Sequence, residues 1–539
     1  MPNITELFVF GLLLCHFGSS YGLSTKSLPY YDAGVVEFSW ENDASSNLQQ
    51  YNNIIHSEDA KQLDIIVFPE MTLSTSGSHI PNPEDKIVPC GNEDYDSIIQ
   101  GISCSAIDSS VYVVINIHEK SECTEESQAA LNDNRTCALN GLNIYNTNVV
   151  FDRNGTVISR YRKFNLFGEL GVNTTLASDI STFETDFGVT FGHFICFDLL
   201  FYTPAFRILS MDITDIIFPA MWFSQLPFLT AVQIQKSWAY ANNVNLLAAG
   251  ANKPNAGNTG SGIYNGRNGS LVDTINTQAE TQLLIARVPK IPRTKRSKTV
   301  PIPINQPNFR QMEIDLLDIF LKREFTLDNF TTVELDLTQS ETHERLCHNE
   351  LCCDIELKIN PRNPSEMANF YRYRLFAYEG ERIFSGVRVT GVATCGIFAC
   401  TNNTLASCGH RLNASDISEL SEQIEFQEIN VSGSFEGGPF MFTMPNSLSS
   451  DLMPLEQFKY DESEEFLDGR CLRKNISHKI TAPTSKLLTF AIYGRNFRKD
   501  DEFYGQQFDQ QCDSAQGLLL SKYVMFVLVI RFLINLYHV

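Results

Sequence analysis

The sequence has little positive charge for its length. Its 41 Lys and Arg residues stand against 63 Asp and Glu residues, so the 539-residue chain has a formal net charge of −22. An acidic surface repels phosphate backbones and anionic lipid headgroups. We therefore expect no nucleic-acid partner, and we expect the acidity to keep the chain soluble. The sequence also contains no internal repeat and no long low-complexity segment, so a repeat architecture is not expected.

The cysteines lack the spacing of a metal site. Cys395, Cys400 and Cys408 lie close together, but neither a CxxC pair nor a closely spaced set of His residues accompanies them. Zinc ligands usually come in such pairs. We therefore favour disulfides over zinc for these cysteines.

The N-terminus carries an apolar run, Leu7 to Leu14, followed by small residues up to Gly22. This pattern predicts a signal peptide over residues 1–22, with cleavage near Gly22. The run is short for a membrane span, so an anchor is the less favoured interpretation, although no Lys or Arg precedes the run. Export would bring the chain into an oxidising compartment, where disulfides persist.

The cysteine count then points to a free thiol. Of 14 cysteines, Cys15 would leave with the signal peptide, so 13 remain. An odd number cannot all pair within one chain, so at least one thiol is free or bonded to a partner. Parity alone does not identify it. The 13 are Cys90, Cys104, Cys123, Cys137, Cys196, Cys347, Cys352, Cys353, Cys395, Cys400, Cys408, Cys471 and Cys512.

Asn-x-Ser/Thr triplets predict N-glycosylation wherever they lie on exposed loops. Such triplets also arise by chance, but nine of them fit an exported glycoprotein better than a cytosolic protein. They begin at Asn134, Asn154, Asn173, Asn268, Asn329, Asn402, Asn413, Asn430 and Asn475.

The C-terminus, residues 518–539, is mostly apolar and follows the small residues Asp513, Ser514 and Ala515. This resembles a GPI-attachment signal over residues 513–539, with the lipid on Ser514 or Asp513. A retained span would place Arg531 in hydrocarbon, at a cost of about 2.5 to 3.5 kcal/mol. The span and an ordinary buried terminus remain alternatives. The GPI interpretation predicts a partner in the outer membrane leaflet.

Residues 23–289 alternate strand-like apolar runs with helix-length segments, which is typical of an α/β domain. Asp152 to Gly155 contains Asn-Gly between two strand-like runs and predicts a hairpin. Leu48–Gln62 and Leu229–Asn242 are the expected helices. The expected strands are Val35–Phe38, Leu63–Pro69, Val111–His118, Asn143–Phe151, Val157–Arg162, Val189–Cys196, Ile213–Pro219, Val244–Gly250 and Leu283–Val288.

A change in composition follows the α/β region. Residues 290–303 are rich in Pro, Lys and Arg, which favours an interdomain linker over a processing site. Residues 304–512 hold eight of the cysteines and short β-rich runs such as Arg388–Ala393 and Leu487–Tyr493. We therefore expect a mostly β, disulfide-rich second domain.

Three segments of the α/β region carry reactive side chains at or near strand ends, where open α/β sheets commonly place their sites. Glu70 ends the run Leu63 to Glu70, Lys163 lies in Arg160 to Phe167, and Cys196 ends an apolar strand. Each has an ordinary interpretation by itself: a solvated carboxylate, an exposed basic cluster and a buried inert thiol.

Together, the order Glu70, Lys163, Cys196 resembles the nitrilase superfamily. The resemblance is closest to its vanin and biotinidase branch, of the insect vanin-like type, and covers nearly the whole chain after the signal peptide. It rests on Phe-Pro-Glu at 68–70, Arg-Lys-Phe-Asn-Leu-Phe at 162–167, Cys-Phe-Asp-Leu-Leu-Phe at 196–201, Phe-Pro-Ala-Met-Trp at 218–222, Leu-Pro at 226–227, Ser-Trp-Ala at 237–239, Val-Asn-Leu-Leu-Ala at 244–248 and Gly-Ser-Gly-Ile-Tyr at 260–264.

The resemblance implies a four-layer α-β-β-α catalytic domain and hydrolysis of a secondary amide through a thioester on Cys196. Glu70 would be the general base, and Lys163 would favour the thiolate and stabilise the oxyanion with the backbone N–H of Phe197. Glu169 is the candidate for a second glutamate. No metal or organic cofactor is required. We also expect Cys196 to be the free thiol, which leaves six disulfides.

The implied partner is a small amide: pantetheine, hydrolysed to pantothenate and cysteamine, or a biotin amide as in biotinidase. A catalytically idle GPI-anchored binding glycoprotein is the alternative from another class. Trp222, Phe223, Leu226 and Pro227 can line the substrate pocket or belong to the core, and the core is favoured. The expected location is extracellular, either at the cell surface or secreted. The oligomeric state stays open.

Overall fold

The computed structural model describes residues 23–73, 76–131, 133–291, 319–363, 370–384, 386, 388–412, 424–467 and 471–501. The predicted signal peptide, the predicted GPI signal with Ser514 and Asp513, most of the predicted linker, and Asn413 lie outside these ranges. Among the described residues, no helix is both long and apolar enough to cross a bilayer.

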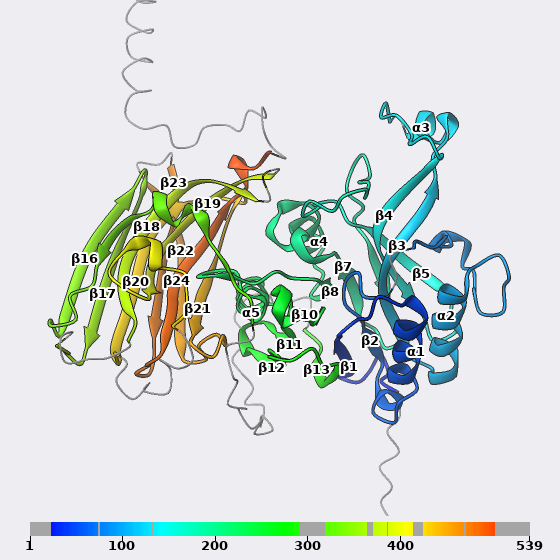
Figure 1. The fold of residues 1–539 in the computed structure, drawn as a ribbon, viewed down its shortest axis with the longest axis horizontal. Coiled ribbons are helices and arrows are strands. Elements are labelled where there is room, and N and C mark those ends of the chain that lie inside the picture. Colours follow the sequence, from blue (N-terminus) through cyan, green and yellow to red (C-terminus); the bar gives the residue numbers. More distant parts are fainter. Residues whose placement is uncertain are drawn as a thin grey trace, which may run out of the picture.

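The first domain is built on two six-stranded sheets packed face to face (Figure 1). In sheet order, the first contains β13 (Gln282–Pro289), β1 (Tyr30–Glu37), β2 (Ile65–Val67), β3 (Tyr112–Glu122), β4 (Leu142–Phe151) and β5 (Val157–Arg162). The second contains β12 (Ser270–Thr274), β11 (Ser261–Asn265), β10 (Asn245–Gly250), β8 (Asp215–Ala220), β7 (Thr190–His193) and β6 (Thr182–Glu184).

Helices cover the outer faces of both sheets. Along β2, Ile65 and Val67 pack between the sheets, whereas Ile66 packs with residues of the helices α1 (Ala44–Ile55) and α2 (Ser97–Ser109). This alternation follows from the two-residue period of a strand. The helices α4 (Arg207–Leu209) and α5 (Ala231–Asn242) lie on the second sheet. The domain is therefore a four-layer α-β-β-α sandwich, as the resemblance implies. A short helix, α3 (Glu125–Leu131), lies at the end of the long β3–β4 hairpin.

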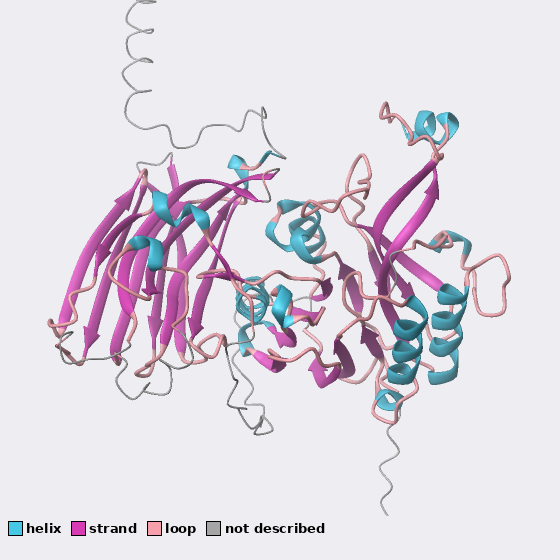
Figure 2. Cartoon of the chain, in the orientation of Figure 1, coloured by secondary structure: helices cyan, strands magenta, loops and turns pink. Residues whose placement is uncertain are grey.

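The second domain is a sandwich of two five-stranded antiparallel sheets (Figure 2). One contains β15 (Thr331–Glu334), β18 (Arg372–Phe384), β19 (Arg388–Cys400), β24 (Leu487–Asn496) and β21 (Met441–Ser449). The other contains β16 (Glu341–His348), β17 (Leu351–Ile359), β20 (Phe426–Glu436), β23 (Cys471–Ile480) and β22 (Phe458–Leu467). The expectation of a mostly β domain is confirmed.

Five disulfides are present in the described residues, and Cys353–Cys395 joins the two sheets of the second domain. The others are Cys90–Cys104, Cys123–Cys137, Cys347–Cys352 and Cys400–Cys408. Among the described cysteines, only Cys196 keeps a free thiol. The side chains of Cys471 and Cys512 lie outside the description, so the sixth disulfide stays a prediction.

The two domains share one continuous core. A buried cluster runs from Phe194 and Trp238 of the first domain to Phe376 and Tyr493 of the second. The short strand β14 (Lys322–Arg323), which leads into the second domain, pairs in parallel with β9 (Gln225–Leu226) of the first. This pairing brings second-domain residues close to the segment that follows β8.

Most expected elements form, with shifted ends. The helix expected over residues 48–62 begins at Ala44 and ends at Ile55, and a 3-10 turn follows. The strand expected to reach Cys196 ends at His193, so Cys196 begins a turn instead of ending a strand. The hairpin at Asp152 to Gly155 is confirmed, because β4 and β5 pair antiparallel around it and Gly155 has a φ of 73°.

Candidate active site

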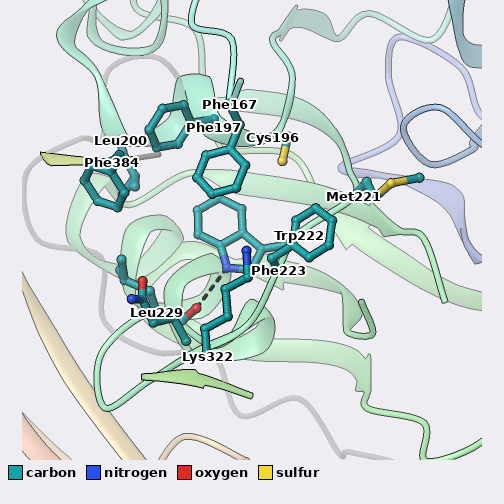
Figure 3. A pocket seen from close by; sticks show the side chains of 11 residues that line it. Phe167, Cys196, Phe197, Leu200, Met221, Trp222, Phe223, Leu229, Lys322 and Phe384 are labelled. Atoms are coloured by element: carbon teal, nitrogen blue, oxygen red, sulfur yellow. Dashed lines mark hydrogen bonds between the residues drawn. The ribbon is translucent and has the colours of Figure 1, made fainter. Parts of the chain in front are cut away.

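Cys196 sits at a sharp corner between β7 and a 3-10 turn that spans Cys196–Leu200. Its φ is 48°, a left-handed conformation that non-glycine residues rarely adopt and that recurs at active sites. The residue is 6% exposed. Figure 3 shows its sulfur at the edge of a pocket lined with aromatic rings. The corner therefore holds the only free thiol of the described residues where a small ligand can reach it.

Glu70 and Lys163 meet next to this thiol. Glu70 follows β2 and Lys163 follows β5, and Lys163 Nζ donates a 2.7 Å hydrogen bond to Oε1 of Glu70. Both side chains are almost fully buried. The Cys196 thiol lies next to the Glu70 carboxylate, close enough for each group to shift the pKa of the other. The structure thus brings together the three residues that the sequence predicted to act together.

Burial and charge fix the protonation states at rest. Burial raises the pKa of the Glu70 carboxyl, but Lys163 and the hydrogen bonds around Glu70 outweigh it and hold that pKa below its ordinary value. For Lys163, burial lowers the pKa, while Glu70, Cys196 and Glu169 together raise it well above the ordinary value. The resting pair is therefore a carboxylate and an ammonium.

The Cys196 thiol behaves differently from the expectation. Burial, followed by the charge of Glu70, raises the pKa of Cys196 well above its usual range, although Lys163 acts in the opposite direction. Lys163 favours the thiolate, as expected, but its effect on the pKa of Cys196 is smaller than the combined effect of burial and Glu70. At neutral pH the resting nucleophile is a thiol that lies next to a carboxylate.

Glu169 lies where the sequence placed a candidate second glutamate. Lys163 Nζ donates a 2.5 Å hydrogen bond to Oε1 of Glu169. The other carboxylate oxygen of Glu169 accepts a hydrogen bond from the backbone N–H of Phe167. An ammonium has three donors, so two hydrogen bonds to carboxylates leave Lys163 one N–H for a reacting oxygen.

The backbone N–H of Phe197 offers a second donor. Phe197 is the second residue of the 3-10 turn, where a helical N–H has no acceptor within its own turn. Lys163 is the other donor near Cys196, since the two groups shift each other's pKa. The arrangement resembles an oxyanion hole.

An amide network that the sequence analysis missed holds Glu70. Asn146 donates from Nδ2 to Oε1 of Glu70 at 2.8 Å, and the backbone N–H of Met221 donates to Oε2 at 2.7 Å. Asn116 in turn donates to the side-chain oxygens of Asn146 and Asn148. The available signal was the presence of polar Asn146 and Asn148 two residues apart, on one face of the otherwise apolar end of β4.

Asp198, also missed, fixes the shape of the nucleophile corner. It accepts hydrogen bonds from Tyr161 Oη at 2.9 Å and from the backbone N–H of Ile195 at 3.1 Å. Its other oxygen accepts from the backbone and side chain of Asn165. Burial raises the pKa of Asp198 to about 6, against the lowering effect of Lys163 and these donors. A carboxylate with this many donors stays ionised at neutral pH and ties the turn to β5.

The pocket at Cys196 is mostly apolar and has a cavity volume of about 40 Å³. Trp222 and Phe223 line it; Trp222 also belongs to the buried core, as expected, whereas the core assignment is wrong for the half-buried Phe223. Leu226 is buried in the core. The second domain adds Phe384, whose ring packs against that of Phe197. The full lining is Phe167, Cys196, Phe197, Leu200, Met221, Trp222, Phe223, Gln225, Leu229, Lys322 and Phe384.

The described residues include no group of three or more His, Cys, Asp or Glu side chains placed to hold a metal ion.

The predicted glycosylation sites in the described residues differ in exposure. Asn430 and Asn475 are half-buried on strands. The exposed ones are Asn134, Asn154, Asn173, Asn268, Asn329 and Asn402.

Known proteins share this architecture along the chain. Residues 32–288 match the family model Carbon-nitrogen hydrolase, and residues 319–500 match the model Vanin C-terminal domain. Vanin-like protein 2 of Drosophila melanogaster is 41% identical over 494 residues, which cover 88% of this chain and 91% of that protein. Pantetheinase of Homo sapiens is 31% identical over 428 residues, which cover 78% of this chain and 75% of that protein. Biotinidase of Mus musculus is 29% identical over 494 residues, which cover 84% of this chain and 87% of that protein. The chain therefore belongs to the carbon–nitrogen hydrolase family, among the vanin-like proteins that carry the vanin C-terminal domain.

Proposed function

We propose that this chain is an amidohydrolase that cleaves a secondary amide through a thioester on Cys196, with pantetheine as its substrate. The observation that carries the proposal is the buried contact of Glu70 with both Lys163 and the Cys196 thiol at the edge of an apolar pocket. Relatives named pantetheinase and biotinidase support this reaction class.

The first half-reaction forms the thioester. As sulfur bonds to the amide carbon, the thiol proton moves to Glu70, and the carbonyl oxygen becomes an oxyanion next to Lys163 and the Phe197 N–H. Because the pKa of the thiol is raised and that of Glu70 is lowered, this transfer is uphill until the carbon–sulfur bond forms. Glu70 then gives the proton to the departing nitrogen, and the carbon–nitrogen bond breaks.

The second half-reaction releases the acid. Glu70, again a carboxylate, takes a proton from a water that attacks the thioester carbonyl, and the same two donors stabilise the oxyanion. The intermediate collapses, the carbon–sulfur bond breaks, and the proton returns to the Cys196 sulfur. Glu70 thus exchanges protons in both halves, which fits its contact with both the thiol and the pocket.

Pantothenate release tests the reaction. Pantetheine already carries a thiol, so pantothenate and the primary amine of cysteamine are measured by mass spectrometry. Wild type should release both in equal amounts, and Cys196→Ser should release neither while keeping the wild-type melting temperature. Side-by-side kinetics on biotinyl-lysine decides between the two substrate classes. Wild type that cleaves neither amide contradicts the proposal and favours a binding glycoprotein.

The proposed location is extracellular, secreted or anchored at the cell surface. Five disulfides support an oxidising compartment. Six exposed acceptor asparagines support glycosylation. In a eukaryotic secretory host, the full chain should lose mass on treatment with a peptide N-glycosidase. Release from the cell surface by a phosphatidylinositol-specific phospholipase would distinguish the anchored form from the secreted one.

A further inference from the structure

Lys322 brings a positive charge from the second domain into the pocket of Cys196. It lies on β14, and its backbone N–H donates a 3.0 Å hydrogen bond to the carbonyl of Ser224, so strand pairing fixes the start of the side chain. Figure 3 shows the side chain extending toward the rings of Phe167 and Phe223. Lys322 lines the same cavity as the thiol.

The ammonium of Lys322 rests on aromatic faces. Its Nζ lies 4.5 Å from the ring centre of Phe223 and 5.4 Å from that of Phe167. The Phe167 ring in turn packs against the ring of Phe197, the residue after the nucleophile. A ligand acylated on Cys196 and extending along these rings would reach the ammonium.

Two other cations of the second domain, Arg323 and Arg382, have carboxylate partners, but among the described residues Lys322 does not. Arg323 pairs with Asp328 at 2.9 Å, and Arg382 pairs with Glu324 at 2.6 Å. Across the described ranges of the chain, no Asp or Glu oxygen lies within the 4.0 Å of an ion pair with Lys322. Burial alone lowers the pKa of Lys322, which indicates an ammonium that has lost water without gaining an anion.

We propose that Lys322 selects amide substrates that carry an anionic group, a carboxylate or a phosphate, at a distance from the scissile bond. This rests on the proposed amidohydrolase function and names its substrate class. An ammonium gains less from a ring face than from a charge-assisted hydrogen bond that it donates to a desolvated anion. Pantetheine offers only neutral groups there, so its anionic analogues are the better substrates.

Matched amides test which half of the substrate carries the anion. 4′-Phosphopantetheine adds a phosphate to the acyl half of pantetheine, and N-pantothenoylcysteine adds a carboxylate to the departing amine. Wild type should show a higher kcat/KM on one of these than on pantetheine. Lys322→Met should lower kcat/KM on the preferred anionic amide by about 10- to 100-fold. It should change kcat/KM on pantetheine by less than about threefold, and Lys322→Arg should keep the preference.

Lys253→Met is the matched control, because Nζ of Lys253 also rests on an aromatic ring, that of Trp40 at 3.9 Å, but lies outside this pocket. Lys253→Met should keep the wild-type ratio of kcat/KM on each anionic amide to kcat/KM on pantetheine. An equal effect of Lys322→Met on pantetheine and its anionic analogues, or no effect on either, overturns the role of Lys322. Wild type that cleaves all three amides without preference also overturns it, but leaves the proposed function intact.

Calorimetry on Cys196→Ala separates recognition from turnover. The inactive variant should bind the preferred anionic amide more tightly than pantetheine, and adding Lys322→Met should abolish the difference. If wild type cleaves no amide, the proposed function fails, while this binding difference still decides the role of Lys322. Equal binding of all three amides contradicts the inference.

Discussion

Arg388 of the second domain donates a 2.8 Å hydrogen bond from Nη1 to Oδ1 of Asn165 in the first. Asn165 donates through its backbone and side chain to Asp198, which shapes the corner of Cys196. A second cation, the buried Arg495, donates from Nε to the carbonyl of Leu200 at 3.0 Å. The second domain is thus connected to the nucleophile turn directly at Leu200 and, through Asn165, at Asp198, in addition to lining the pocket.

Replacing Arg388 with Met should therefore lower activity without unfolding the chain. The change removes the donor that orients Asn165, so the Cys196 corner becomes less well fixed. We expect kcat on the best amide to fall about tenfold, with KM changed by less than about threefold. Steady-state kinetics and a melting curve measure the two effects.

Asp501→Asn is the control for this variant. Asp501 accepts hydrogen bonds from Nε and Nη2 of Arg388 and makes no contact with Asn165. Asp501→Asn should change kcat by less than about threefold. Equal losses in the two variants would mean that the Arg388–Asp501 pair, and not the contact with Asn165, matters.

Glu169→Gln should impair the chemical step. The substitution removes one of the two carboxylates that bind the Lys163 ammonium, and with it part of the charge that raises the pKa of Lys163. We expect kcat to fall about 10- to 100-fold. Single-turnover measurement of acyl-enzyme formation checks that the loss lies in chemistry. Glu184→Gln, an exposed carboxylate on β6, should keep wild-type rates. Wild-type kcat in Glu169→Gln would show that Glu169 only positions the backbone at Phe167.

The sequence predicts the part of the site that lies on continuous apolar segments. Glu70, Lys163 and Cys196 each closely follow a strand, so strand patterning and the family resemblance located them together. Asn116 and Asn146 were missed because polar residues within mostly apolar strands do not show which side chain they contact across the sheet. Lys322 was missed because a two-residue parallel pairing between distant segments depends on tertiary packing.

The same physical reasons apply to the fold. β5 was predicted over its observed bounds because Val157–Arg162 alternates buried and half-buried residues. Helix α2 was missed because Gly101 and several serines lower its intrinsic helix propensity. Its start signal is visible in retrospect, since Asp96 caps the N-terminus by accepting hydrogen bonds from two backbone N–H groups.

Alkylation of Cys196 should be slow at neutral pH and accelerate as pH rises. The thiolate is the reactive form, and burial and Glu70 keep the pKa of this thiol well above its usual range. Iodoacetamide should therefore modify one thiol in the unreduced protein, with a rate that increases about tenfold per pH unit from pH 6 to 8. Intact-mass kinetics measures the rate. A rate that is already independent of pH at neutrality would show a resting thiolate and contradict the assigned protonation state.

The stability of the fold should decrease as the pH rises from about 5 to 7, because of Glu37 at the end of β1. Burial raises the pKa of Glu37 to about 7 from an ordinary value of 4.5, although Ser261, Gly260 and Thr259 donate hydrogen bonds to it. In this window the folded carboxyl keeps a proton that the unfolded one has lost, so the free energy of unfolding falls with pH, by about 3 kcal/mol in total.

Glu37→Gln isolates this contribution, because its amide does not titrate. Urea unfolding of wild type and variant at pH 5 and at pH 8 measures how far the free energy of unfolding of each protein falls between the two pH values. The decline from pH 5 to pH 8 should be smaller in Glu37→Gln than in wild type. The control is Glu184→Gln, whose carboxyl is exposed and should leave the wild-type decline in place. Equal declines in wild type and Glu37→Gln would mean that Glu37 titrates near its ordinary pKa in the folded chain, and that its donors offset burial.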